Sequence, residues 1–321
     1  MFYSVIIPVY NRPQEVDELL ESLTQQTYTN FEVLIVEDGS SDKCDHIVPK
    51  YQDKLKITYF FKPNTGQGFS RNFGFDQAKS DYFIVFDSDC IIPSHYFQAV
   101  EDYLKDNPVG AFGGPDKAHE SFTAMQKAIS YSMTSPFTTG GIRGNKKHYG
   151  TFHPRSFNMG ISKDVYEKVG GYKITRMGED LEFSMRIIKA GYQTALIEDA
   201  FVYHKRRTSL SQFYKQLHFF GRARINVGRF YPEEVKLLHW FPALFTLGFL
   251  SLPLLYFIFW PLAAMGLGVY LLFLAVNFSS SLAKNKSIKV AILSMATSFT
   301  QLTAYGVGFL KELVKPSTKT K

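Results

Sequence analysis

The chain of 321 residues is 45% hydrophobic and 20% charged, which is enough to bury a full α/β core and still supply a second module. Its two cysteines, Cys44 and Cys90, are too few for a disulfide framework, and we expect both to be reduced structural thiols. The net charge of +7 does not indicate nucleic-acid binding, because no stacking or zinc motif accompanies it.

Short apolar runs alternate with helical periodicity in the first part of the chain. Residues 1–4 lead directly into an apolar run without a basic segment or a cleavage site, so we expect no secretory signal. Strands are predicted at Tyr3 to Pro8, Phe31 to Glu37, Leu55 to Phe61 and Tyr82 to Phe86. Helices are predicted at Val16 to Leu23, Asp42 to Tyr51 and Gly66 to Ala78. This alternation predicts an α/β fold with a parallel central sheet.

The segment 134–154 is rich in Gly, Thr, Lys and His, with Gly140 to Lys147 at its centre. This composition predicts a loop. A mobile lid over a binding site and a variable solvated insertion both fit it.

Ser209 to Phe230 has helical periodicity and a basic flank. One face collects the apolar residues Leu210, Phe213, Tyr214, Leu217 and Phe220. Cations lie around and before it, namely Lys205, Arg206, Arg207, Lys215, Arg222, Arg224 and Arg229. An interfacial helix on an anionic membrane leaflet is the favoured interpretation, and an ordinary packed helix is the alternative.

Residues 240–312 form an apolar region that predicts membrane anchoring. The segments 241–260 and 262–282 each approach the ~20 apolar residues that a bilayer span needs, with a tight turn near Pro261. The segment 290–310 is long enough for a third span but is richer in Ser, Thr and Gln, so a re-entrant or interfacial segment is also open. We expect a multi-pass protein of the cytoplasmic membrane with its α/β domain facing the cytosol, because two spans return Lys284, Lys286 and Lys289 to that side.

Asp87 and Asp89 follow the apolar strand that ends at Phe86. In an extended backbone, carboxylates two residues apart project to the same side. Paired carboxylates suit a Mg²⁺ or Mn²⁺ ion that also binds phosphate oxygens, although Asp is also a common turn former at strand ends. Because ligands of parallel sheets bind beyond the carboxyl ends of the strands, this place favours a metal and phosphate site.

Three other polar segments follow predicted strands or open helices. Asp38 ends the second strand and can accept a hydrogen bond from a nucleobase or ribose, or shape a turn. Gly66 and Arg71 lie in a Gly-bearing loop that enters a helix and suits anions. Glu179 and Asp180 precede a helical stretch, where the helix dipole favours the ionised form that a general base needs; helix capping is the alternative.

Taken together, these motifs resemble the family 2 glycosyltransferases over roughly residues 3–230. The segments that carry the resemblance are Pro8-Val9-Tyr10-Asn11-Arg12, Glu37-Asp38-Gly39-Ser40, Arg71-Asn72-Phe73-Gly74, Asp87-Ser88-Asp89, Asn158-Met159-Gly160, Val169-Gly170-Gly171-Tyr172, Gly178-Glu179-Asp180 and Arg186 to Tyr192. The ordered set is much more specific than any one member.

The resemblance implies a GT-A fold, which is a Rossmann-like nucleotide-sugar-binding domain, and inversion at the anomeric carbon. The implied donor-binding residues are Pro8, Tyr10, Asn11, Arg12, Asp38, Gly66, Arg71, Asp87 and Ser88. The implied ligands of a divalent cation are Asp89, Asp87 and His204. Asp180 is the implied catalytic base with Glu179 beside it, and Asn158, Met159 and Gly160 are the implied acceptor or sugar pocket. The expected domains are a catalytic domain at 1–206, an interfacial linker at 207–239, membrane helices at 240–312 and a basic tail at 313–321.

The expected reaction transfers a sugar, with UDP-sugars favoured over GDP-sugars, to a lipid-linked or membrane-proximal glycan at a membrane. Processive relatives carry an Arg-Trp pair that is missing after Gln216, which favours single addition. A polyprenyl-phosphate sugar synthase is the alternative within this chemistry. A sugar-phosphate nucleotidyltransferase and a noncatalytic nucleotide-sugar-binding scaffold are alternatives from other classes.

Overall fold

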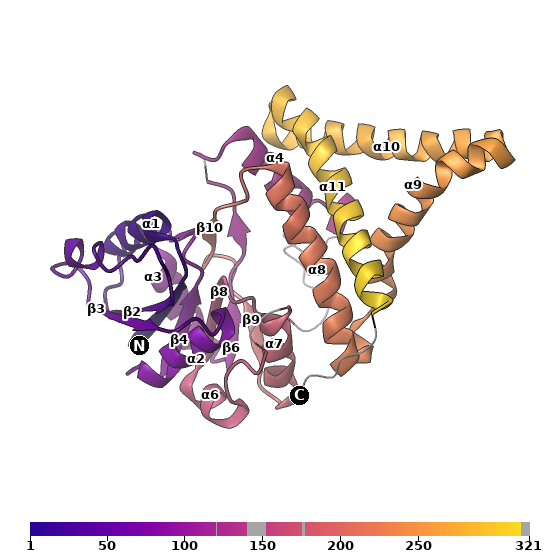
Figure 1. Cartoon of the computed structure of the whole chain (residues 1–321). Coiled ribbons are helices and arrows are strands. Elements are labelled where there is room, and N and C mark those ends of the chain that lie inside the picture. Colours follow the sequence, from indigo (N-terminus) through magenta and orange to yellow (C-terminus); the bar gives the residue numbers. More distant parts are fainter. Residues whose placement is uncertain (120, 140–151, 175–176, 316–321) are drawn as a thin grey trace. The chain divides into compact units, whose positions relative to one another are not determined.

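The computed structural model describes residues 1–119, 121–139, 152–174 and 177–315. The chain divides into two compact units (Figure 1). The first comprises Met1–His119 and Lys146–Lys205, and the second Glu120–Asn145 and Arg206–Lys321. The second unit takes in residues 120–145, which were expected in the catalytic domain; the boundaries at 206, 239 and 312 stay predictions.

A seven-stranded sheet forms the centre of the first unit, in the order β3-β2-β1-β4-β8-β6-β9. Its strands are β1 (Tyr3–Val9), β2 (Phe31–Asp38), β3 (Ile57–Lys62), β4 (Tyr82–Phe86), β6 (Ala111–Gly113), β8 (Asn158–Ser162) and β9 (Thr194–Leu196). Four neighbouring strands, β3 to β4 in that order, are parallel, and β8 runs antiparallel to both of its neighbours. The prediction of an α/β fold with a mostly parallel sheet is confirmed.

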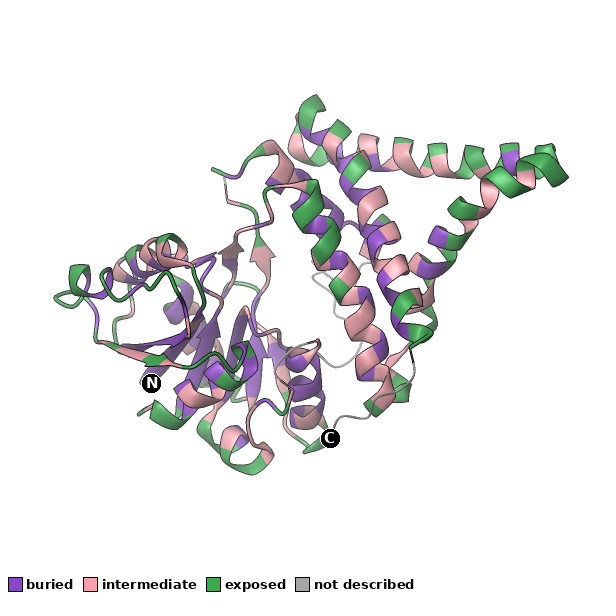
Figure 2. Cartoon of the chain, viewed as in Figure 1, coloured by how far each residue is buried: buried purple, intermediate pink, exposed green. Residues whose placement is uncertain are grey.

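Helices cover both faces of this sheet. Successive side chains of a strand point to opposite faces, so the continuous apolar strands have side chains to bury on both sides. Val5 and Ile7 of β1 pack with α1 (Pro13–Thr24) and α3 (Tyr96–Asp106) in one core. Ile6 packs on the other face with α2 (Gln67–Gln77), α6 (Lys163–Val169) and α7 (Glu179–Lys189). The central strands are accordingly buried in Figure 2. This sandwich fixes the carboxyl ends of β1, β2 and β4 along one edge, as expected for parallel strands.

A second, three-stranded sheet consists of β5 (Cys90–Ile91), β10 (Val202–His204) and β7 (Asp116–Lys117), of which β5 directly follows the turn after β4. β10 pairs antiparallel with β5, so that His204 is opposite Cys90. The pairing therefore brings a residue from the end of the first unit beside the Asp87-Ser88-Asp89 segment.

The predicted helix at 42–51 is wrong. Its place is taken by turns and the short 3-10 helix η1 (Val48–Lys50). The backbone N–H of Cys44 donates to Oε2 of Glu37, and Pro49 lacks the N–H that an α-helix would use. The other predicted elements of this region occur, with their ends shifted by at most three residues.

The second unit is helical. It contains α4 (Ala124–Thr134), α5 (Pro136–Thr139), α8 (Leu210–Phe230), the 3-10 helices η2 (Pro232–Glu234) and η3 (Leu237–Trp240), α9 (Phe241–Ile258), α10 (Trp260–Asn285) and α11 (Ile288–Leu313). Within the part of the chain that the structure describes, three helical segments are long and apolar enough to cross a membrane: Leu237–Ile258, Trp260–Asn285 and Ile288–Leu313. These helices support membrane association. The break between the first two falls at Phe259, two residues before the predicted turn.

The predicted helix at 209–230 is present as α8, with the Ser209 hydroxyl accepting from the backbone of Gln212. Phe213 and Leu217 of its apolar face are buried against protein, whereas Tyr214 is exposed. The buried part of this face is thus an ordinary packed one. Of the predicted loop at 134–154, residues 140–151 lie outside the described residues.

Candidate active site

Asp87, Ser88 and Asp89 form a turn directly after β4, and this turn gives the two aspartates different partners. The Asp87 side chain is about one-third exposed and accepts from Arg71, whereas Asp89 is buried and pairs with Arg12 and His204. Ser88 is buried between them. The extended geometry assumed from the sequence is therefore not retained after Phe86.

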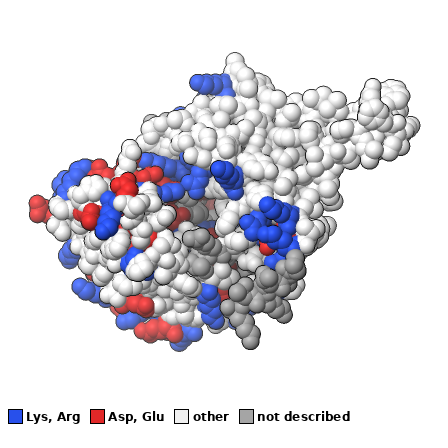
Figure 3. Space-filling model, viewed as in Figure 1, with Lys and Arg blue, Asp and Glu red and all other residues white. Residues whose placement is uncertain are grey.

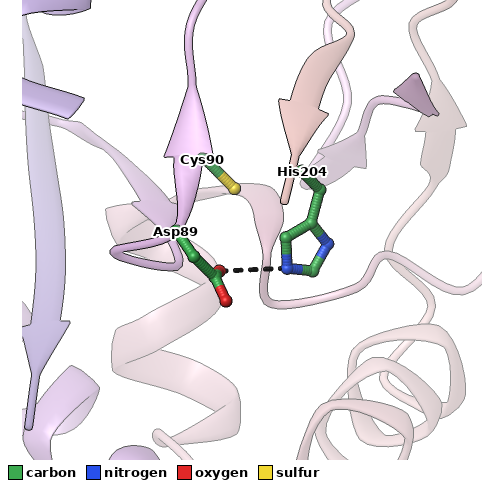
Figure 4. A group of neighbouring side chains, drawn as sticks. All are labelled: Asp89, Cys90 and His204. Atoms are coloured by element: carbon green, nitrogen blue, oxygen red, sulfur yellow. Dashed lines mark ion pairs between the residues drawn. The ribbon is translucent and has the colours of Figure 1, made fainter. Parts of the chain in front are cut away.

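Asp89 lies between the side chains of an arginine and a histidine. Arg12 Nη1 is 2.5 Å from Oδ2 of Asp89, and His204 Nε2 is 3.0 Å from Oδ1 (Figure 4). Burial alone would raise the pKa of Asp89, but the nearby His204 imidazole and Arg12 guanidinium hold this pKa below its usual range. Asp89 is therefore an ionised carboxylate inside the protein, as a metal ligand has to be.

Asp89, Cys90 and His204 offer ligand atoms that all lie within 4.8 Å of one another. A carboxylate oxygen and an imidazole nitrogen suit Mn²⁺ and, less well, Mg²⁺. The Cys90 thiol does not fit such an ion, because burial raises its pKa well above the usual value and its Sγ donates to the Phe157 carbonyl. Asp89 and His204 thus fit a divalent cation, with Cys90 as a neutral neighbour.

Arg71, on α2, connects the Asp87 turn to the first turn of α7. Its side chain is 1% exposed; Nη2 donates to Asp87 Oδ1 at 2.8 Å, and Nη1 lies 3.6 Å from Glu179 Oε1. Its guanidinium also lies over the Tyr172 ring, 5.3 Å from the centroid. A group buried among these partners is poorly placed to contact a nucleotide, so the structure favours a positioning role over the predicted contact.

The two residues that precede the carboxylates at the start of α7 both have positive φ. Met177 has φ 65° and Gly178, the N-cap of the helix, has φ 99°. A non-glycine residue in this region of φ is uncommon and is typical of functional sites. The chain then enters α7 at Glu179 and Asp180, next to the positive end of the helix dipole.

Glu179 and Asp180 have different surroundings. Glu179 is buried and accepts from the Gln67 amide; burial, followed by the nearby Asp180, raises the pKa of Glu179. The Asp180 side chain is 23% exposed, and its Oδ2 lies 3.4 Å from Nη1 of Arg155. Asp180 is therefore the member of the pair that an acceptor can reach.

The predicted nucleotide contact Asp38 is fully engaged with its own protein. Its carboxylate accepts from the Lys62 ammonium and from the backbone N–H groups of Thr65 and Gly66. These bonds hold the loop after β3 against the end of β2. The pKa of Asp38 is low because the Lys62 and Thr65 hydrogen bonds outweigh the effect of burial.

The loop after β1 is fixed by Asn11, which has φ 53°. Its Oδ1 accepts from the backbone N–H groups of Ser41 and Asp42, and its own N–H donates to Ser40. Of the other donor residues predicted here, Pro8 is half-buried and Tyr10 is exposed. Asn11 thus positions the loop; Tyr10 and Asn11 are exposed, and Arg12 is half-buried.

The residues of the predicted acceptor pocket, Asn158, Met159 and Gly160, are all buried, and their role in binding stays a prediction. These residues form β8 in the middle of the sheet, where Asn158 and Met159 are 0% exposed. Asn158 accepts from the Tyr96 hydroxyl and donates to the Ala200 carbonyl. The motif is therefore part of the core, where a buried amide with both partners satisfied has a structural role.

Two further residues belong to the site, and sequence reasoning missed them. Arg155 reaches Asp180 from the strand-flanking segment before β8, and Lys62 pairs with Asp38. Lys62 ends a strand of the parallel set, so its position was a usable signal. Arg155 carried no comparable signal, because its proximity to Asp180 depends on the antiparallel β8.

Residues 4–170, just over half of the chain, match the family described as Glycosyl transferase family 2. An uncharacterized glycosyltransferase of Haemophilus influenzae is 31% identical over 219 residues, which are 65% of this chain and 70% of that protein. Match and motifs agree, and the chain belongs to glycosyl transferase family 2. The family prediction made from the sequence is confirmed.

Another relative, an uncharacterized glycosyltransferase of Rickettsia felis, is 36% identical over 139 residues. The match covers 43% of this chain but only 22% of the length of that relative. Among solved structures, the mannosyltransferase PcManGT from Pyrobaculum calidifontis, in complex with GDP-Man and Mn²⁺, superposes with a TM-score of 0.61 at 17% identity. The alignment covers 97% of this chain and 87% of PcManGT, so the two proteins share a fold.

Proposed function

We propose that the protein is an inverting glycosyltransferase that moves a sugar from a nucleoside-diphosphate donor to a hydroxyl group of a lipid-linked or membrane-proximal glycan. The observation that carries this proposal is the position of Arg71, which contacts both Asp87 and Glu179. It makes the Asp87-Ser88-Asp89 turn and the first turn of α7 neighbours. The diphosphate-binding residues and the catalytic base would then belong to one site.

Asp89 and His204 would hold a divalent cation, Mn²⁺ or Mg²⁺, with Asp87 close by. Such an ion supplies Lewis-acid stabilisation of the departing nucleoside diphosphate. Arg12, which donates to Asp89 through Nη1, would be available to the phosphate oxygens of the donor. The Mn²⁺ and GDP-Man of the mannosyltransferase with the same fold support a nucleotide-sugar donor. Family habit favours UDP over GDP for this chain.

Asp180 would accept the proton of the acceptor hydroxyl while that oxygen attacks the anomeric carbon. The new bond joins the acceptor oxygen to this carbon, and the bond to the diphosphate oxygen breaks with its electron pair. One displacement from the opposite face gives inversion. Arg155 keeps Asp180 oriented, and Glu179 remains turned toward Gln67 and Arg71.

Anchoring in a membrane would place the protein next to lipid-linked acceptors. The apolar helices α9 and α10 support an anchor, and the lysines that follow α10 favour the cytosolic side of the cytoplasmic membrane for the chain on either side of them. An acceptor carried on a lipid would meet the site at that surface.

The test uses membranes that contain the full chain, a panel of UDP- and GDP-sugars, and Mn²⁺, with identification of the product by mass spectrometry. A glycan or lipid-linked glycan extended by one sugar supports the proposal. Sugar found directly on a polyprenyl phosphate would replace it with the synthase alternative. A parallel reaction with added pyrophosphate tests the nucleotidyltransferase, which would release a nucleoside triphosphate and a sugar 1-phosphate. No turnover despite donor binding would point to the scaffold.

A further inference from the structure

We propose that α11 lies in the plane of the membrane surface and does not cross the bilayer, although its length and composition qualify it as a span. The inference rests on the proposed membrane location and is independent of the transferase chemistry. In this arrangement, α9 and α10 enter the membrane as a hairpin and α11 lies across the base of that hairpin. The C-terminal end of α11 then lies on the same side of the membrane as Lys284, Lys286 and Lys289, at the junction of α10 and α11.

The two helices α9 and α10 form a hairpin whose tip is apolar. They meet at Phe259, and Phe257, Ile258 and Trp260 beside it are 84%, 70% and 65% exposed. Exposed apolar side chains of this size need a lipid environment. If the hairpin enters the membrane tip first, α9 begins and α10 ends on the same side of it.

The two ends of α11 lie beside these two ends of the hairpin. Near its start, Ser294 and Ser281 of α10 share a hydrogen bond of 2.7 Å. Near its end, the Phe309 ring lies 5.0 Å from Trp240, and Gly306 packs against the carbonyl of Pro242 at the start of α9. In Figure 1, α9, α10 and α11 accordingly outline a triangle with α11 as one side.

These contacts conflict with a crossing by α11. Ser294 and Gly306 are separated by twelve residues, which is about 18 Å along an α-helix. In a spanning helix the two would lie at very different depths. Because their partners Ser281 and Pro242 lie at the same side of the hairpin, both residues of α11 also lie at that side.

The burial of α11 agrees with this position. Half of its most apolar 18-residue window is buried inside the protein, compared with 11% for each of the other two candidate spans. A second face of α11 packs on α8 and α4: Gly221 approaches the Tyr305 carbonyl so closely that a Cβ would lie 2.1 Å from it, and the Thr297 hydroxyl donates to the Ala128 carbonyl at 3.1 Å. α11 is therefore covered by protein along most of its length.

Cations gather at both ends of α11, which is the arrangement expected of a helix whose two ends meet anionic headgroups. At one end are Lys284, Lys286 and Lys289; at the other are Arg222, Arg229, Lys311 and Lys315, with Glu312 bonded to both arginines. Figure 3 shows Lys and Arg at these two places, while the projecting hairpin is white. A spanning α11 would place one of the two groups on the outer side, against the positive-inside rule.

The inference is tested by cysteine labelling of the full chain in its membrane. Lys286→Cys and Lys311→Cys place exposed thiols at the two ends of α11, and the native Cys44 and Cys90 are buried, so the unsubstituted protein is the background control. A membrane-impermeant maleimide is added to intact spheroplasts and to inside-out vesicles.

We expect both introduced cysteines to react in inside-out vesicles and to be protected in spheroplasts. Labelling of the two positions from opposite sides would overturn the inference, because α11 would then cross the membrane. Sugar transfer is measured on the same membranes, so that the two proposals can fail separately. If the protein is active but the two cysteines are labelled from opposite sides, only the in-plane helix is refuted. If the protein is inactive but both cysteines are labelled from the same side, only the proposed function is refuted.

Discussion

Arg12 Nη1 lies 2.5 Å from Oδ2 of Asp89, although the two residues are 77 positions apart in the chain. The loops that follow β1 and β4, neighbouring parallel strands, bring them together. The guanidinium thus occupies one oxygen of the carboxylate that is proposed to bind a cation. Arg12 serves as the counter-ion of Asp89 in the cation-free protein and is available to a diphosphate once the cation is bound.

Arg12→Ala is expected to tighten Mn²⁺ binding to the nucleotide-free protein by roughly tenfold, equivalent to about 1.4 kcal/mol, because a like charge next to the ion is removed. Binding is measured by electron paramagnetic resonance of free Mn²⁺. Arg12→Lys keeps the charge and is the matched control, with an affinity close to that of the unsubstituted protein. Unchanged or weaker Mn²⁺ binding in Arg12→Ala would refute the counter-ion role.

Arg71→Met is expected to lower the free energy of unfolding by about 3–5 kcal/mol, since it leaves the buried Glu179 carboxylate without its cationic partner. Thermal unfolding in detergent measures the effect. Adding Glu179→Gln to this variant removes the uncompensated carboxylate and should recover part of the loss. If the single variant is as stable as the parent, Arg71 does not hold the two carboxylates in place.

Glu179 makes the stability of the first unit depend on pH. Burial and then Asp180 raise the pKa of Glu179 in the folded protein above its unfolded value of about 4.3. The contribution of this group is complete below about pH 4.3 and is lost as the pH rises through the folded pKa, because only the unfolded chain ionises freely in that window.

Glu179→Gln cannot ionise, so the difference in melting temperature between this variant and the parent should move in favour of the variant as the pH rises from about 4 to 7. The exposed Glu21→Gln is the control, and its difference should stay flat. A Glu179→Gln difference that stays constant, or that moves in favour of the parent, would show that the carboxylate is stabilised in its ionised form.

The sequence patterns predicted the strands of the central sheet more accurately than the segments that connect them. β4 occurs at its predicted bounds because all five of its residues are buried, which leaves an uninterrupted apolar run. At 42–51, the buried residues Cys44, Ile47, Val48 and Tyr51 have helical spacing, yet tight turns and η1 satisfy the same burial. The bond from Cys44 to Glu37 that favours the turns links separate segments and leaves no periodic signal.

For the candidate site, the sequence predicted where residues lie in the fold but not the direction in which their side chains point. The aspartates and Glu179 lie where the topology predicted, at the ends of strands and at the start of a helix. Arg71 and Asn158 occur in motifs of the same kind but point into the protein, where Asp87, Tyr96 and the Ala200 carbonyl bind them. A motif of polar and glycine residues does not distinguish a ligand contact from a buried support, because both require specific polar groups.

The central claim is that the site has a donor half at Asp89 and an acceptor half at Asp180. It is tested most directly by measuring Mn²⁺-dependent binding of the nucleotide and turnover side by side in Asp89→Ala and Asp180→Asn, with the exposed Asp53→Asn as control. Asp89→Ala should lose the Mn²⁺-dependent part of binding. Asp180→Asn should bind the nucleotide as the parent does and turn over roughly 10²–10⁴-fold more slowly. Full turnover by Asp180→Asn would contradict the account.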